Sequence, residues 1–307
     1  DKPNLFISLF DVWVMTSPRY KEIDQIASWT PLDHVTMPTK VEEHSRKSNV
    51  HPIAMAPNGV RLFEAKGIEH SYVPHSVNTR LMKPTKTLAN GMAVEDYFKS
   101  SDKFVVGMVA ANKASGMVHR KAFSENLLAF KMFQKDHPDA VLYIHTDPTF
   151  PLGWNLMQLV EACGLDPDTI MFPNPLDYRI GVDPKHLAAL YTGMDVLLAP
   201  SYGEGFGVPT IEAQACGTRV IGSGWAATPD LVSDDCWLVE GQPQWDSALN
   251  AWWQIPKVGS IVEALKLAYA EGKTKSDKSI QMAKIYDVEN VWNNHWLPTL
   301  TKLLPQK

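Results

Sequence analysis

The residues with the clearest chemical potential are two glutamates, Glu204 and Glu212, which stand eight positions apart. Between them lie the glycine-containing turn 205–207 and Pro209, which is placed for the first turn of a helix. Glycines let a ligand approach the backbone, and a helix amino terminus offers free N–H groups and a partial positive charge that suit phosphate. Glu212, one turn into the helix, can accept hydrogen bonds from a ribose diol, and Glu204 can hold hydroxyls of a second group. The segment therefore predicts a site for a nucleoside diphosphate that bears a polar group.

The elements that must position these residues form an alternating pattern. Apolar, β-branched runs predict strands at 104–109, 141–144, 170–172, 196–199 and 219–222. Helical spacing predicts helices at 120–135, 152–163, 186–194 and 209–216. Weaker signals predict strands at 5–10, 25–30 and 52–55, a helix at 58–66, and a Trp- and Leu-rich helix at 288–304 that Pro298 interrupts. This alternation indicates an α/β fold with a doubly wound parallel sheet, which binds ligands at the carboxyl ends of its strands.

The composition excludes several classes of protein. The 307 residues carry a formal net charge of −5 and no long basic run, so nucleic acid is not an expected partner. No stretch approaches the ~18 uninterrupted apolar residues that a membrane span needs. The 3 cysteines are too few for a disulfide scaffold, which predicts a reducing compartment and a cytoplasmic location.

The segment around the two glutamates resembles the EX7E signature of retaining glycosyltransferases with the GT-B fold, in family 4, also called glycosyl transferases group 1. Residues 186–201 resemble the lead-in of this family through their HLAALY, DV and PS elements, and PHSVNT at 74–79 resembles its PHGVDT interdomain motif. The resemblance covers roughly residues 5–296 and is strongest over 183–224. It implies two Rossmann-like, doubly wound domains that face a cleft. It also implies retaining transfer of a sugar from a nucleoside diphosphate sugar, UDP- or GDP-linked, to an acceptor hydroxyl that the sequence does not identify.

Carried over residue by residue, the resemblance implies a role for each matching position. Glu204 contacts the transferred sugar, Glu212 binds the ribose, and Lys121 neutralises the departing diphosphate. His34 is the candidate for the histidine that the family places near the donor sugar. The expected catalytic residues are thus Glu204, Lys121 and His34. The expected donor-binding residues are Glu212, Gly205, Phe206, Gly207, Val208, Lys121 and Asn112.

The chain departs from the family pattern at one position. Met108 follows Gly107 where the family has an arginine close by, so Asn112 or Lys113 is the expected substitute. Because the helix dipole, the loop amides and Lys121 can supply a positive field, no metal or other cofactor is expected to be required. The nucleotide sugar is a co-substrate.

Three parts are expected along the chain. Residues 1–82 form a partial, acceptor-side Rossmann-like domain, residues 83–287 form the nucleotide-sugar-binding domain, and residues 288–307 form a helix that packs back on the first domain. The interdomain motif comes early by analogy with the family. The amino-terminal domain is therefore expected to be incomplete, in a fragment of a longer protein or in a naturally shortened member. Two other functions stay open: a nucleotide-sugar-binding module or subunit without activity of its own, and phosphorolysis or epimerisation of the nucleotide sugar.

Overall fold

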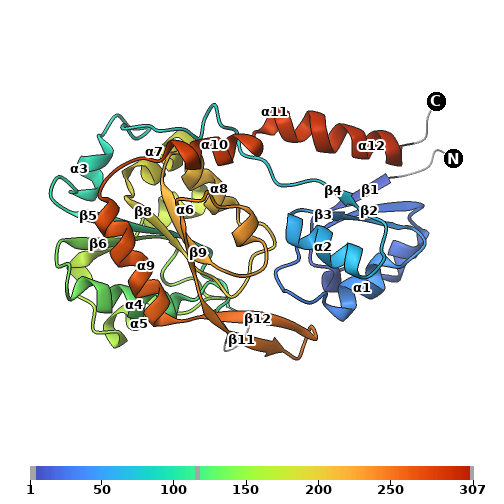
Figure 1. Cartoon of the computed structure of the whole chain (residues 1–307), viewed down its shortest axis with the longest axis horizontal. Helices are drawn as coiled ribbons and strands as arrows, with labels where there is room; N and C mark the ends of the chain where they lie inside the picture. Colours follow the sequence, from blue (N-terminus) through green and yellow to red (C-terminus); the bar gives the residue numbers. More distant parts are fainter. Residues whose placement is uncertain (1–4, 115–117, 305–307) are drawn as a thin grey trace.

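The computed structural model describes residues 5–114 and 118–304. Two parallel β-sheets form two lobes that lie side by side (Figure 1). The strand orders are β1-β2-β3-β4 in the amino-terminal lobe and β10-β9-β8-β5-β6-β7 in the carboxy-terminal lobe. Along the described residues, no helix is both long and apolar enough to cross a membrane.

The amino-terminal lobe is a four-stranded sheet with helices packed on it. Its strands are β1 (Leu5–Ser8), β2 (Gln25–Thr30), β3 (Val50–Ala54) and β4 (Ser71–Tyr72), and its helices are α1 (Thr39–Ser45) and α2 (Pro57–Ala65). Val41 of α1 and Phe63 of α2 are fully buried and pack with Leu32 and Ala54 in one apolar cluster. Two short 3₁₀ helices, η1 (Val12–Val14) and η2 (Pro18–Glu22), follow β1. η1 lies just beyond the carboxyl end of β1, and η2 leads on to the start of β2.

The carboxy-terminal lobe is doubly wound, as expected. Its strands are β5 (Phe104–Val109), β6 (Ala140–His145), β7 (Ile170–Met171), β8 (Val196–Ala199), β9 (Arg219–Ser223) and β10 (Trp237–Val239). Helices α4 (Phe123–Gln134), α5 (Leu156–Ala162) and α9 (Val258–Glu271) share one apolar core. Helices α3 (Val94–Phe98), α7 (Pro184–Gly193), α8 (Val208–Ala215) and α10 (Asp277–Ile285) share the other. Alternate side chains of β5 enter the two cores, Val105 on one face and Val106 on the other, as the period of two requires.

The last helical segment crosses back to the amino-terminal lobe (Figure 1). It consists of α11 (Val288–Val291), the π-helical turn η5 (Trp292–Trp296) and α12 (Leu297–Leu303). Val291 and Leu303 pack with Val73 and with residues of β2 and β3. An interruption at Pro298 was expected, but the helical segment continues through this residue. The proline lies in the first turn of α12, and the wider π turn before it accommodates a ring that would clash with the carbonyl four residues earlier.

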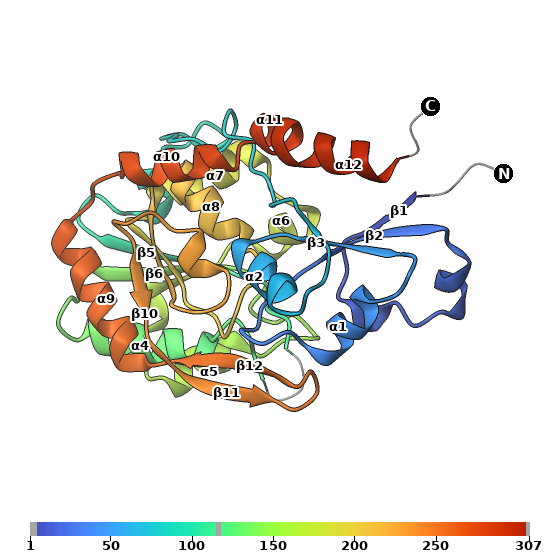
Figure 2. The same cartoon turned by 45° about the vertical axis from the view of Figure 1, so that its right-hand side comes forward.

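A β-hairpin that the sequence pattern did not predict extends from the carboxy-terminal lobe. Its strands are β11 (Gly241–Asp246) and β12 (Ala251–Pro256), and Figure 2 shows it running along the base of the lobe towards α1. The hairpin is hydrogen-bonded to the amino-terminal lobe. Trp252 accepts from the backbone N–H of Val35 and donates its own N–H to Oγ1 of Thr36, both at 3.2 Å, while Leu249 accepts from the N–H of Thr39 at 3.2 Å. The hairpin therefore forms a wall that belongs to one lobe and is attached to the other.

Candidate functional site

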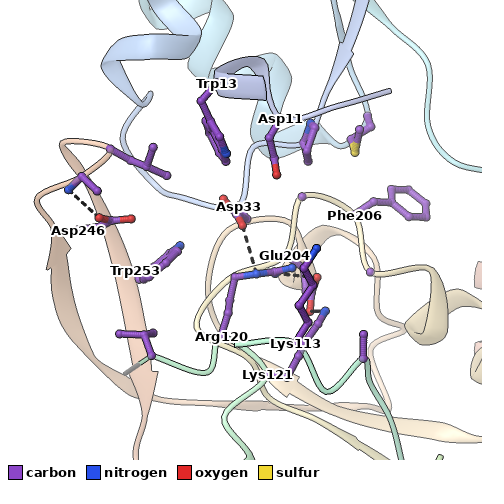
Figure 3. A pocket seen from close by; sticks show the side chains of 18 of the residues that line it. Asp11, Trp13, Asp33, Lys113, Arg120, Lys121, Glu204, Phe206, Asp246 and Trp253 are labelled. Carbon is purple, nitrogen blue, oxygen red and sulfur yellow. Dashed lines mark hydrogen bonds and ion pairs between the residues drawn. The ribbon is translucent and has the colours of Figure 1, made fainter. Parts of the chain in front are cut away.

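A cavity of about 750 Å³ lies where the two lobes and the hairpin meet (Figure 3). The amino-terminal lobe contributes the segment after β1, the turn after β2 and part of α1. The carboxy-terminal lobe contributes the loops after β5 and β8, at the carboxyl ends of these strands. The charged residues in the lining are Asp11, Asp33, Lys40, Lys113, Arg120, Lys121, Glu204 and Asp246.

The centre of the site is a carboxylate held by two cations. Oε1 of Glu204 accepts from Nζ of Lys121 at 2.5 Å, and its Oε2 accepts from Nη1 of Arg120 at 3.1 Å. Burial on its own would raise the pKa of Glu204, but the two cations lower it to about 2. Burial lowers the pKa of Lys121 although Glu204 acts in the opposite direction. The pKa of Arg120 is raised, because the carboxylates of Glu204 and Asp33 outweigh the effect of burial. The cluster thus combines one ionised carboxylate with two cationic side chains that a ligand phosphate can also contact.

The loop that carries Glu204 connects β8 to α8. Gly207 has a φ of 90°, a left-handed conformation that glycine adopts without strain, and it leads directly into α8, whose amino terminus has no side-chain cap. Pro209 lies in the first turn of α8, as expected. Residues 205–208 all line the cavity. These are the positions that the sequence predicts for contacts to the donor.

The same loop touches the amino-terminal lobe through glycines. A Cβ at Gly205 would lie 2.6 Å from Cβ of Pro31, and a Cβ at Gly203 would collide with the carbonyl oxygen of Asp33. Arg120 also donates to the carbonyl oxygen of Gly203. The turn after β2 and the Glu204 loop are therefore in direct backbone contact across the gap between the lobes.

Glu212 does not line the cavity. Tyr191 donates its hydroxyl to Oε2 of Glu212 at 2.9 Å, and burial raises the pKa of this carboxyl although Tyr191 counteracts the effect. No described residue donates a hydrogen bond to Oε1, so half of the carboxylate is available. Tyr191 sets the orientation of a group that lies on α8 one turn beyond the cavity.

The structure does not place Asn112 where a donor-binding residue must lie. Asn112 is buried, and its Nδ2 donates to the carbonyl oxygens of Asp147 and Trp154 at 3.0 and 2.8 Å. Its Oδ1 accepts from the backbone N–H of Trp154 at 3.0 Å and lies 3.1 Å from Nε2 of His119. Because the amide is fully used in joining neighbouring loops, it has nothing left for a ligand. Lys113, the other expected substitute, does line the cavity.

His34 is also displaced from its expected position. It is completely buried, its Nδ1 lies 2.7 Å from Oδ1 of Asp33, and its Nε2 lies 3.6 Å from Oδ2 of Asp246. Its ring stacks on Trp253 with centroids 4.9 Å apart. His34 lies behind two carboxylates that do line the cavity, so it can position them but does not face a ligand itself. The ring cannot turn towards the cavity, because Trp253 and Asp246 of the hairpin pack against it.

Two site residues were missed by the sequence analysis. Arg120 precedes Lys121, and Asp33 precedes His34, yet only the second member of each pair was assigned a role. Helix α4 begins at Phe123 rather than at residue 120, because Ala122 has a φ of 52°, so both Arg120 and Lys121 lie on the loop before it. Nε of Arg120 lies 3.5 Å from Oδ2 of Asp33, which joins the lobes across the cavity. Burial would raise the pKa of Asp33, but His34 and Arg120 lower it.

Comparison with known proteins connects this geometry to a family. Residues 104–251 match the family described as glycosyl transferases group 1. "Uncharacterized glycosyltransferase 335" of Sulfolobus islandicus rod-shaped virus 1 is 23% identical over 71% of this chain and 63% of its own length. A D-inositol 3-phosphate glycosyltransferase of Corynebacterium kroppenstedtii is 33% identical over 41% of this chain and 28% of its own length. The chain thus spans less than two thirds of the length of these curated relatives.

Solved structures show the same architecture at low sequence identity. A sucrose-phosphate synthase from Thermosynechococcus elongatus superposes with a TM-score of 0.69 at 17% identity, over 95% of this chain and 71% of its own. The pneumococcal O-GlcNAc transferase GtfA, in complex with UDP and GlcNAc, gives a TM-score of 0.67 at 14% identity, over 100% of this chain and 58% of its own. The chain has the GT-B fold, and the part that matches glycosyl transferases group 1, residues 104–251, contains Arg120, Lys121 and Glu204.

Proposed function

We propose that this chain transfers a glycosyl group from a nucleoside diphosphate sugar to an acceptor hydroxyl, with retention of the anomeric configuration. The observation that supports the proposal most is the position of Glu204. It lies with Arg120 and Lys121 in the cavity between two GT-B lobes, on the loop that leads into the amino terminus of α8.

The diphosphate of the donor would bind at the cationic side of the cavity. Arg120 and Lys121 together exceed the charge of Glu204 by one, and Lys113 adds a further cation to the same lining. The uncapped amino terminus of α8 contributes its partial positive charge. These groups would stabilise the negative charge that develops on the leaving diphosphate, and for this reason we propose no metal requirement.

Glu204 and Glu212 would divide the rest of the donor between them. Once phosphate oxygens take over the two cations, Glu204 is free to accept hydrogen bonds from hydroxyls of the transferred sugar. The available Oε1 of Glu212 would accept from the ribose, while Tyr191 holds Oε2 at 2.9 Å. Base, sugar and acceptor identity do not follow from these contacts.

Retention is proposed to occur by displacement on one face of the sugar. The bond from the anomeric carbon to the diphosphate oxygen breaks, and the bond to the acceptor oxygen forms on the same side. The acceptor proton passes to the departing diphosphate. Glu204 is a poor candidate for the base, because a carboxyl with a pKa of about 2 has little affinity for a proton. A binding module without activity gains no support from the comparisons.

The test is product analysis with UDP-, GDP-, ADP- and dTDP-linked sugars and a mixed panel of acceptors. We expect free nucleoside diphosphate and a new glycoside with the anomeric configuration of the donor. Lys121→Ala and Glu204→Gln should each reduce transfer about 100-fold or more, the usual loss for an electrostatic group at the reacting centre. Lys131→Ala, which removes an exposed lysine from α4, is the matched control. An inverted glycoside, or an isomerised nucleotide sugar, would contradict the proposal.

A further inference from the structure

Charges and aromatic rings divide the cavity into two unlike halves. Lys113, Arg120 and Lys121 come from the loop after β5 and lie together with Glu204. The amino-terminal lobe and the hairpin supply Asp11 and Asp246. Figure 3 shows the ring of Trp13 reaching down beside Asp11 and the ring of Trp253 standing next to Asp246, on the side away from Lys121. The second half is aromatic and acidic.

We propose that Trp13, Trp253, Asp11 and Asp246 form the acceptor site, and that it takes an uncharged sugar or polyol. This inference rests on the proposed function, because it assigns the half of the cavity that the donor leaves free. Indole rings offer broad apolar faces with little conformational entropy to lose, which suits the C–H face of a sugar ring. Ionised carboxylates accept hydrogen bonds from hydroxyls at the edge of the same ring.

The two rings are held in place by different elements. Trp13 lies on η1 and packs against the apolar cluster of α1 and α2. Trp253 lies on β12 and is fixed by the stacked ring of His34. The indole Nε1 of Trp253 is buried and has no hydrogen-bond partner among the described residues, and in Figure 3 the nitrogen end of this ring is turned towards the middle of the cavity. An unused donor at that position is suited to a ligand hydroxyl, since a buried N–H without a partner is unfavourable.

The charge of this half excludes phosphorylated acceptors as good ligands. Among the described lining residues of this side, Asp11 and Asp246 outnumber Lys40, and Asp33 is compensated by Arg120 at 3.5 Å. Oδ1 of Asp246 accepts from the backbone N–H of Ala248 at 2.9 Å, which holds this carboxylate at the hairpin turn. A phosphate beside these carboxylates would be repelled. The chain should therefore differ in acceptor preference from a relative named for D-inositol 3-phosphate.

The experiment is saturation-transfer NMR of the chain with two neutral probes, methyl α-glucoside and maltotriose, and with D-inositol 3-phosphate. We expect at least one neutral probe to bind and D-inositol 3-phosphate to bind at least about 10-fold more weakly. Trp13→Ala and Asp246→Asn should weaken binding of the neutral probe about 10-fold, and Trp13→Phe should restore most of it. Trp245→Ala, which removes an exposed tryptophan of the same hairpin, is the matched control and should change nothing.

The outcomes separate this inference from the proposed function. Absence of binding by both neutral probes, tighter binding of D-inositol 3-phosphate, or an equal loss in Trp245→Ala and Trp13→Ala would overturn the acceptor assignment. Calorimetry with UDP and GDP on the same samples tests the donor site independently. Nucleotide binding without neutral-sugar binding would reject only the acceptor site. Neutral-sugar binding without any nucleotide binding would reject the proposed transferase and leave the sugar site in place.

Discussion

Among single residues, Glu204 has a strongly perturbed environment in the cavity, and its charge is linked to stability. The pKa of this carboxyl is about 2 in the folded chain, against an ordinary value of 4.5. A lowered pKa means that the folded state binds its proton less readily than the unfolded state does. The stabilisation is therefore complete above the unfolded pKa and is lost as the pH falls towards the folded one.

Glu204→Gln should accordingly lower the free energy of unfolding by about 2–3 kcal/mol at neutral pH, because Arg120 and Lys121 then repel each other without compensation. The difference between the wild type and the variant should shrink steadily between about pH 5 and pH 2. Urea denaturation across this pH range measures it. A difference that stays constant, or grows as the pH falls, would show that Glu204 is not held ionised by the two cations.

Replacing His34 tests whether its buried ring only positions Asp33 and Asp246 or contacts the substrate during transfer. The ring is enclosed by Asp33, Asp246 and Trp253, so His34→Ala should leave a cavity and cost about 2–4 kcal/mol of stability. Thermal denaturation with and without nucleotide measures the loss. If His34→Ala kept its stability but abolished turnover, His34 would have to contact substrate after all.

The candidate site was predictable from the sequence mainly where its residues are consecutive in the chain. Glu204 and residues 205–208 form one continuous loop whose glycine and proline positions determine its backbone. Lys121 was found from the same family resemblance. The positions of Asn112 and His34 could not be inferred, because both depend on which other segments fold around them. Asp33 gives no local signal at all, since its role arises from the approach of Arg120 on the opposite lobe.

At the level of elements, the contact between the Glu204 loop and the turn after β2 depends on glycine. A Cβ at Gly205 would approach Cβ and Cα of Pro31 to 2.6 and 2.9 Å. Gly205→Ala should therefore push the two elements apart and reduce transfer at least about 10-fold, because a shift of about 1 Å at a reacting centre is costly. Small-angle scattering and the transfer assay measure the two effects.

The matched control is Gly259→Ala, since a Cβ at this position of α9 meets nothing within 4 Å. Alanine there should leave transfer unchanged and raise stability by up to about 1 kcal/mol through helix propensity. Equal transfer by the Gly205→Ala chain and the wild type would show that the close approach is not needed for activity.

The elements themselves differ in how far the sequence predicted them. The strands β5 and β8 have the predicted bounds, because both are apolar runs of strand length within an alternating pattern of strands and helices, and β2 also has its predicted bounds although its signal was weaker. The hairpin of β11 and β12 was not predicted, since Gln, Pro and exposed Trp residues do not alternate as a half-buried strand does. Its strands are stabilised by each other and by the amino-terminal lobe, which a local pattern does not reveal.

For the whole molecule, the terminal segment α11–α12 completes the apolar core of the amino-terminal lobe. Val291 is fully buried against Ala27, Ile53 and Val73. Val291→Ala should therefore destabilise this lobe by about 2 kcal/mol and raise hydrogen exchange in β2 and β3. Leu297→Ala, at a position 48% exposed, is the control. Unchanged exchange in β2 and β3 would mean that the segment lies on the lobe without stabilising it.

The two lobes are joined on more than one side. Arg61 of α2 makes two hydrogen bonds of 3.0 and 2.8 Å to Asp230 of the carboxy-terminal lobe. On another side the hairpin is bonded to the segment that leads into α1. These links hold the cavity in the arrangement on which the proposed function depends, with the cationic loops of one lobe opposite the acidic segment of the other.

The central claim is that a nucleoside diphosphate binds with its phosphates at Lys121 in the cavity and its ribose at Glu212, one turn beyond the cavity on α8. Thermal stability with UDP, GDP, ADP and dTDP tests this claim most directly. At 100 times its dissociation constant, a bound nucleotide should add about 2.7 kcal/mol to the stability of the chain. We predict such a shift with at least one of the four nucleotides, absent in Lys121→Ala and Glu212→Ala and preserved in Lys131→Ala. No shift with any nucleotide, or a shift that survives in both site variants, would contradict the claim.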